Sequence, residues 1–202
     1  TGAPYNQAWR PMILAKACAS VAWCDIVQAK RALRFSGMSD DDALSHATSD
    51  GRQSPVAAAV QRGVCRMLIH MGHMPITELG LKNGRRVDVA SLDKKGDVII
   101  VEIKSSLADF RVDQKWPEYL DYCDRFFFAV PPDFPLDVLP DDAPVGIIVA
   151  DKFGAEVLRE PDRDALSAAR RKAVTVLFAR AAAARVHQAL DPGVSALLVN
   201  DD

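Results

Sequence analysis

The segment from Val98 to Lys104, VIIVEIK, constrains the fold of this chain most strongly. It begins with four apolar residues, and its length is typical of a strand in the centre of a sheet. Charged side chains are rare in such a strand unless they are paired or bind a metal ion. Glu102 and Lys104 therefore indicate a functional site, although the tripeptide Glu-Ile-Lys alone would favour a solvated salt bridge.

Two shorter strands are expected before this one, over 76–81 and 85–92, and each connector contains a glycine at its end. Loops over 82–84 and 94–96, each with a left-handed glycine at its last position, would join the strands into two hairpins. In that register one face of the sheet is apolar, and it carries the opposed pairs Leu79 with Val87, Thr77 with Val89, Val89 with Val101 and Val87 with Ile103. A shorter turn made of Asn83 and Gly84 alone would instead put Leu79 opposite Asp88 and mix the faces.

The same register gathers charged side chains on the other face of the sheet. Glu78 falls opposite Asp88, Asp88 falls opposite Glu102, and Lys104 lies beside Glu102. With the shorter turn, Glu78 leaves this group while the other three side chains stay. Carboxylates on neighbouring strands repel one another, so burying them raises their pKa values and lowers stability.

A divalent cation would remove this repulsion. Magnesium prefers oxygen ligands, and the candidate ligands are Asp88, Glu102 and the carbonyl of Ile103. A bound metal ion would lower the pKa of a coordinated water and neutralise charge that develops on a phosphodiester. Lys104 is placed to orient that water or to help deprotonate it. The residues therefore predict phosphodiester hydrolysis with Mg²⁺ or Mn²⁺ as cofactor, and Asp88, Glu102 and Lys104 as the catalytic group.

The rest of the chain alternates helices and strands. A helix is expected from Pro55 to near Gly72 with Ser54 as its N-cap, and a second helix, after a loop, with Asp113 as its cap. Further strands are expected over 125–130, 145–150 and 155–159, and a long helix over about 164–190. The predicted divisions are a partly disordered N-terminal extension (1–53), one α/β domain (54–190) and an acidic tail (191–202).

The order of helix, three antiparallel strands, helix and strand, with Asp88 on the second strand and Glu102 and Lys104 on the third, resembles the PD-(D/E)XK nuclease superfamily over about 55–130. More narrowly, segments 84–106, 109–131, 147–160 and 169–182 resemble the bacterial MmcB-like DNA-repair family. The resemblance implies a restriction-endonuclease-like α-β-β-β-α-β core, with a mixed central sheet flanked by helices and a C-terminal helix. It also implies metal-dependent DNA cleavage, with Asp88 and Glu102 as metal ligands and Lys104 as the catalytic lysine.

The first core helix departs from the superfamily pattern, because many members add an acidic residue there. Here Gln61 is the one polar candidate of similar length, and Glu78 is the candidate for the missing charge. The departure keeps a second hypothesis open: a nuclease-like module that binds damaged or branched DNA, or a repair partner, without cutting. A third hypothesis is a nuclease that processes RNA or tRNA.

Five residues are candidates for contacts with DNA. Arg86, Arg111 and Lys115 can contact phosphates or pair with nearby acids. Trp116 and Tyr119 can stack on an unpaired base or pack on the sheet. The expected partners are DNA and other DNA-repair proteins, and no membrane.

Composition and charge narrow these hypotheses. The chain has a formal net charge of −2, so the phosphate contacts of a DNA-binding protein must here be local. No window reaches the ~18–20 apolar residues of a membrane span, and no secretory signal is evident, so the cytoplasm is expected, with association with the nucleoid. The spacing of the four cysteines indicates free thiols, and His70 and His73 are interpreted as helix-terminal histidines.

Overall fold

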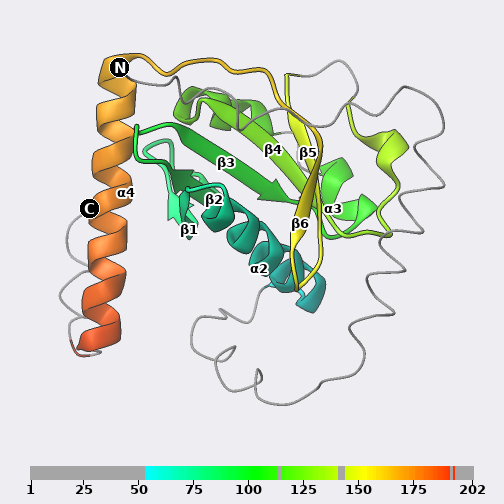
Figure 1. Ribbon diagram of the computed structural model, residues 1–202, viewed down its shortest axis with the longest axis horizontal. Coiled ribbons are helices and arrows are strands. Elements are labelled where there is room, and N and C mark those ends of the chain that lie inside the picture. The colour runs from blue at the N-terminus through cyan, green and yellow to red at the C-terminus, as the bar shows by residue number, and fades with distance from the viewer. Residues whose placement is uncertain (1–52, 113–114, 141–143, 192, 194–202) are drawn as a thin grey trace, which may run out of the picture. The chain divides into compact units, whose positions relative to one another are not determined.

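The computed structural model describes residues 53–112, 115–140, 144–191 and 193. The predicted N-terminal extension (1–53) and acidic tail (191–202) therefore lie outside the described residues, apart from Gln53, Asp191 and Gly193. The described part is an α/β fold in which a six-stranded mixed sheet is flanked by helices (Figure 1).

The strands follow one another in the sheet in chain order, β1 to β6. Strands β1–β2, β2–β3 and β5–β6 pair antiparallel, whereas β3–β4 and β4–β5 pair parallel. The elements are α2 (Pro55–His70), β1 (Met74–Gly80), β2 (Arg86–Leu92), β3 (Val98–Ile103), α3 (Leu107–Val112), the 3₁₀ helix η1 (Trp116–Tyr122), β4 (Arg125–Val130), the 3₁₀ helix η2 (Leu136–Val138), β5 (Gly146–Ala150), β6 (Ala155–Arg159) and α4 (Ala168–Leu190). This order confirms the expected α-β-β-β-α-β core with a mixed sheet and a C-terminal helix.

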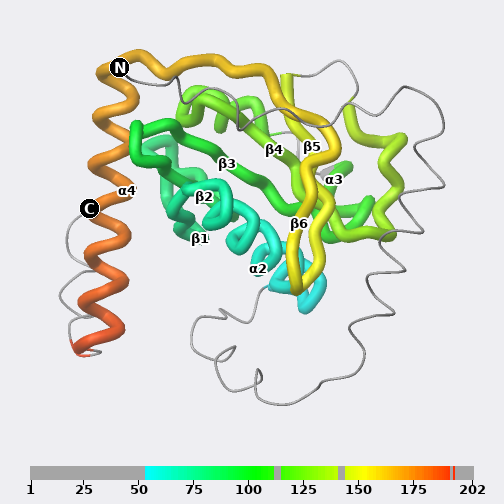
Figure 2. The backbone as a smooth tube through the Cα atoms, viewed as in Figure 1, coloured from blue at the N-terminus to red at the C-terminus, as the bar shows by residue number. Residues whose placement is uncertain are grey.

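The two hairpins have the register that three-residue loops predict. Leu79 lies opposite Val87, and Val89 lies opposite Val101. Gly84 and Gly96 close the loops with φ angles of 77° and 80°, a conformation that glycine adopts without steric cost. The register excludes the shorter turn, and Figure 2 traces the chain through both hairpins.

Helix α2 begins as the sequence predicts, because Ser54 Oγ accepts a hydrogen bond from Ala57 N at 3.1 Å. Its apolar stripe packs on one face of the sheet (Figure 1). The buried residues of this layer are Val60, Val64, Leu68, Val89, Ile99, Val101, Ile103, Phe127, Ala129, Ile148 and Ala150. The opposite face is covered from η1 and α4, and its buried layer contains Leu79, Val87, Ala90, Ile100, Tyr119, Phe126, Phe128 and Val174.

This division corrects the expectation that Leu79, Val87, Val89 and Ile103 share one face. Val89 and Ile103 face α2, whereas Leu79 and Val87 belong to the opposite layer. The reason lies at Glu78, whose φ angle of 51° is in the left-handed region. The β1–β2 pairing keeps one register but omits the pair of Glu78 and Asp88, and the alternation of side chains between the two faces changes here in both strands. A positive φ is uncommon for a residue with a side chain, so the sequence did not indicate it.

The segment after Lys104 also differs from the expectation. Helix α3 begins at Leu107, where a loop was predicted, and Ser106 Oγ accepts a hydrogen bond from Asp109 N at 3.2 Å. Asp113, the predicted cap of a longer helix, lies outside the described residues. The chain resumes helical structure in η1, with Pro117 in its first turn, where a missing N–H is harmless.

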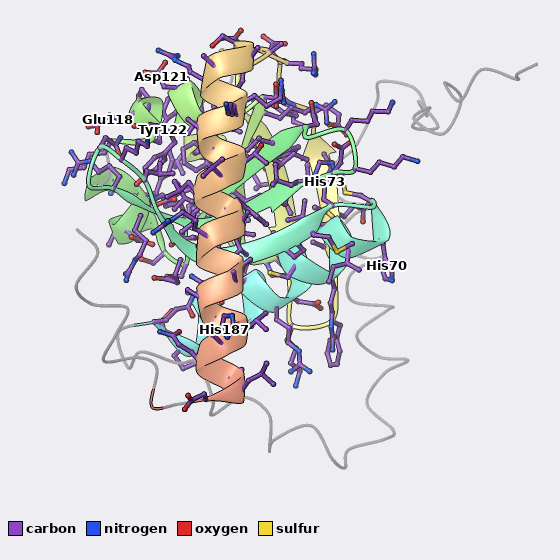
Figure 3. The ribbon with its side chains drawn as sticks, turned by 90° about the vertical axis from the view of Figure 1, so that its left-hand side faces the viewer. His70, His73, Glu118, Asp121, Tyr122 and His187 are labelled. Atoms are coloured by element: carbon purple, nitrogen blue, oxygen red, sulfur yellow. The ribbon has the colours of Figure 1, made fainter. Side chains whose placement is uncertain are left out.

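Helix α4 starts at Ala168 with Ser167 as its N-cap, a few residues later than predicted. It is anchored through Arg171, whose guanidinium donates to both carboxylate oxygens of Asp124 at 2.6 and 2.7 Å. Asp124 is fully buried at the start of β4, and it also accepts hydrogen bonds from Val98 N and Leu166 N. In the view of Figure 3, α4 lies in front of the sheet and Asp121 of η1 lies near its upper end, where Arg170 reaches it.

Among the described residues, no helix is long and apolar enough to cross a lipid bilayer. Cys65 and Cys123 are free thiols, as predicted, while Cys18 and Cys24 lie outside the described residues.

Candidate active site

Glu102 and Lys104 form a buried ion pair at the end of β3. Lys104 Nζ lies 3.5 Å from Glu102 Oε1, and the side chains are 3% and 9% exposed. Taking two such charges out of water is costly, and a buried pair is often no more stabilising than an apolar pair of similar size. The burial of this ion pair is therefore better explained by a role in function than by a contribution to stability. Strand alternation puts Glu102 on the same face as Ile100, opposite the face that α2 covers.

Asp88 lies on β2, and its side chain is hydrogen-bonded to the neighbouring strand β3. Its Oδ2 accepts a hydrogen bond from Ile103 N at 2.7 Å. The backbone pairing of β2 with β3 runs from Leu92 to Val89. Beyond Val89, the Asp88 side chain accepts the hydrogen bond from the backbone N–H of Ile103. It is thereby fixed beside the residue that separates Glu102 from Lys104, and the structure brings the three predicted catalytic residues together.

The charges around Asp88 act strongly on its carboxyl group. Burial raises the pKa of Asp88 to about 6, against the opposing effects of the Ile103 amide and the Lys104 ammonium. The carboxylates of Glu78 and Asp109 raise this pKa further. A perturbed acid with specific charged neighbours is typical of a functional site.

Glu78 belongs to this neighbourhood, but its carboxylate is engaged by an arginine. Glu78 Oε2 lies 2.7 Å from Arg86 Nε, and the two side chains are 36% and 56% exposed. The backbone carbonyl of Glu78 accepts a hydrogen bond from Arg185 Nη2 of α4 at 3.1 Å. The structure thus places Glu78 next to the site, and Arg86 of β2 compensates its negative charge.

Asp109 is a residue of this neighbourhood that the sequence analysis missed. It lies in the first turn of α3, is exposed, and accepts a hydrogen bond from Ser105 N at 3.3 Å. Ser106 followed three residues later by an acid is a helix-start signal that could have identified it. Its bond to Ser105 ties α3 to the residue that follows Lys104.

The donor set fits a hard divalent cation. Asp88 and Glu102 offer carboxylate oxygens, and Ile103 offers a backbone carbonyl. Magnesium and manganese take such ligands, and magnesium commonly uses one or two carboxylates and fills the remaining positions with water and substrate phosphate. No group of three His, Cys, Asp or Glu side chains suited to a metal occurs in the described ranges. Mg²⁺ and Mn²⁺ stay predictions.

Four of the five predicted DNA contacts separate into two groups. Arg111 on α3 and Lys115 just before η1 are exposed. Tyr119, in contrast, is 5% exposed and stacks on Phe126 with ring centroids 6.1 Å apart, and Trp116 packs 5.9 Å from the same ring. Of the two alternatives for Tyr119, the structure shows packing on the sheet: its ring is part of the core, and Tyr119 is corrected as a candidate contact with a base. Trp116, which is half-buried, is used in packing against the sheet as well.

Three other residues that the sequence singled out, Gln61, His70 and His73, differ in burial and in hydrogen bonding. Gln61 Nε2 is buried, without a hydrogen-bond partner in the part of the chain that the structure describes. His73 is buried with its Nδ1 3.3 Å from Ser91 Oγ, while His70 is exposed in the last turn of α2. Figure 3 shows both histidines on the side of the molecule away from Glu118 and Asp121. His70 is the last residue of α2, and His73 lies between α2 and β1.

Comparison with known proteins agrees with this architecture. The family model for MmcB-like DNA repair proteins matches residues 44–193. The chain is 39% identical to the SPO1766 protein of unknown function from Silicibacter pomeroyi, covering 70% of this chain and 95% of that structure with a TM-score of 0.66. A repair endonuclease from Pyrococcus abyssi is 22% identical over 44% of this chain and 42% of that one, with a TM-score of 0.29. None of the curated proteins matches significantly. The chain belongs to the MmcB-like DNA repair protein family.

Proposed function

We propose that this protein is a divalent-metal-dependent deoxyribonuclease that hydrolyses phosphodiester bonds in DNA repair. The observation that carries the proposal is the position of Asp88, held on the Ile103 amide beside the buried Glu102–Lys104 pair. Family membership supports DNA as the partner and repair as the setting.

Each residue of the site has a role in this proposal. Asp88, Glu102 and the carbonyl of Ile103 would hold Mg²⁺ or Mn²⁺, which supplies charge neutralisation at the phosphate and a more acidic water. The Lys104 ammonium has three donors, and its burial against Glu102 fixes their direction. Lys104 therefore orients the attacking water and opposes negative charge that develops on the phosphate.

The surface around the site supports a DNA substrate through local contacts. Arg111 and Lys115 are exposed on the segment that follows Lys104, and they are the candidate contacts with phosphates. The net charge of −2 predicts that binding is weak away from these contacts and falls with added salt.

A cleavage screen with a matched pair of variants tests the proposal. Single-stranded, duplex, flap and junction DNA, and matched RNA, would be incubated with Mn²⁺ or with EDTA. We expect Mn²⁺-dependent DNA cleavage that Glu102→Gln lowers by about 100-fold, the scale of losing one group that stabilises a transition state. Glu156→Gln, an exposed change on β6 at the opposite edge of the sheet, is the control and should cleave like wild type.

Failure of the wild-type chain to cut any DNA with Mn²⁺ would overturn this proposal, and faster cleavage of the RNA would favour an RNA-processing nuclease. A second candidate function is DNA binding without cleavage. It is favoured by the absence of an acid from α2 and by the engagement of Glu78 with Arg86. Calorimetry that shows DNA binding but no binding of Mg²⁺ or Mn²⁺ would select this second function.

A further inference from the structure

The ion pair between Arg86 and Glu78 joins two residues that the proposed function would use separately. Arg86 is a candidate phosphate contact, and Glu78 is the candidate for the charge that α2 lacks. In the structure they neutralise each other at 2.7 Å, and both side chains remain reachable from solvent. The N–H donors of Arg86 that contact the Glu78 carboxylate are not available to a phosphate, so the two anions compete for this guanidinium.

Glu78 is well placed to act on the site once it is released. It occupies the position between the Thr77–Val89 and Leu79–Val87 pairs, which is the position facing Asp88. Its carboxylate already acts electrostatically on Asp88. Its backbone is kept in place from two directions, by the flanking pairs and by the Arg185 hydrogen bond to its carbonyl.

The left-handed backbone of Glu78 is a further sign of constraint. Such a conformation is unfavourable for a residue with a side chain, and it persists where the surrounding structure enforces it. Here it resets strand alternation, which packs Leu79 in the core while Glu78 stays beside Asp88.

We infer that Arg86 couples DNA binding to metal binding: a DNA phosphate draws Arg86 away from Glu78, and the released carboxylate joins Asp88 and Glu102 at the cation. This inference rests on the proposed nuclease function and deepens it. Without DNA, Arg86 lowers the affinity of the site for the cation, because Arg86 compensates the negative charge of Glu78, which would otherwise attract the cation. By linkage, DNA and metal then raise each other's affinity by the same factor.

Calorimetric titration of MnCl₂ into the full chain tests the coupling without measuring cleavage. Each titration is done once without DNA and once with a saturating phosphorothioate duplex, which resists hydrolysis. The variants are Arg86→Gln and Glu78→Gln. Arg85→Gln is the matched control, because Arg85 adjoins Arg86 but donates to Glu118 at 3.0 and 3.1 Å.

We expect Arg86→Gln to bind Mn²⁺ about two- to fivefold more tightly than wild type without DNA, the range that an exposed ion pair of this kind supports. The duplex should tighten Mn²⁺ binding of wild type and Arg85→Gln by a similar factor. It should tighten Mn²⁺ binding of Arg86→Gln and Glu78→Gln clearly less, because only the direct contact between a DNA phosphate and the cation remains in these variants.

Two results would contradict the inference in distinguishable ways. If Mn²⁺ binds wild type and Arg86→Gln equally, with the same response to the duplex, the coupling is wrong and the proposed nuclease function stands. If wild type binds no Mn²⁺ with or without the duplex, the proposed metal-dependent function itself fails, and the coupling fails with it.

Discussion

Replacing Asp88 by asparagine should stabilise the metal-free protein at neutral pH. Asparagine keeps an oxygen that can accept the hydrogen bond from Ile103 N, but it removes the buried charge. The pKa of Asp88 is raised from 3.8 to about 6, mainly by burial. At about 1.4 kcal/mol per pH unit, this difference makes the ionised carboxylate cost about 3 kcal/mol of folding free energy.

The sign of the pH dependence follows from the raised pKa. The folded protein holds the proton more tightly than the unfolded chain, so the contribution of Asp88 to stability is complete below pH 3.8 and is lost as the pH rises through about 6. The advantage of Asp88→Asn over wild type should therefore be largest above pH 7 and disappear toward pH 4.

Urea unfolding in EDTA, followed by tryptophan fluorescence at several pH values, measures this difference. Trp116 packs on the core, so its emission reports unfolding. Asp109→Asn, an exposed acid near the site, is the control and should change stability by less than about 0.5 kcal/mol. An Asp88→Asn variant that is less stable than wild type at pH 7.5, or a difference that does not vary with pH, would show that the buried Asp88 charge does not destabilise the fold.

Three further variants test the packing of the fold and site. Lys104→Ala should abolish cleavage and, because it leaves the Glu102 carboxylate buried without its ammonium, lower the unfolding free energy by about 3 kcal/mol in a urea titration. Arg171→Ala should cost about 3–5 kcal/mol in the same titration, since it removes two donors from the fully buried Asp124. Gly146→Ala should lower the thermal midpoint by several degrees, because its new methyl group would lie 2.4 Å from an aromatic ring of the core.

Two of these variants have a matched control in the chain. Arg170→Ala removes an exposed pair with Asp121 and should cost less than about 1 kcal/mol, so an equal loss for Arg171→Ala would contradict the anchoring of α4. Gly80→Ala adds a methyl group with nothing within 4 Å and should leave the thermal midpoint near that of wild type. Cleavage by Lys104→Ala at the wild-type rate would remove Lys104 from the catalytic group.

Local signals were sufficient to predict much of the fold. Glycines at the ends of the two loops predicted the hairpins of β1, β2 and β3, and the three-residue loops that place apolar residues opposite one another gave the observed register. The bounds of β4 and β6 were correct because each is a compact run bordered by turn residues. Ser54 and Pro55 identified the start of α2 through the chemistry of helix capping.

The remaining features depend on tertiary contacts that no local pattern encodes. Glu78 has no intrinsic preference for a left-handed backbone, so the exchange of faces at this residue was not predictable. Tyr119 is equally suited to a base and to Phe126, and only the path of η1 decides that it packs in the core. The pairing of Arg86 with Glu78 joins two residues whose charges also suit other partners.

The most direct test of the proposed metal centre is anomalous diffraction from crystals of the wild-type chain grown with MnCl₂. We expect a manganese peak within coordination distance of Asp88 and Glu102 and of the Ile103 carbonyl. Crystals of Asp88→Asn provide the control and should lose the peak. Manganese bound elsewhere, with none between these two carboxylates, would contradict the proposed metal centre.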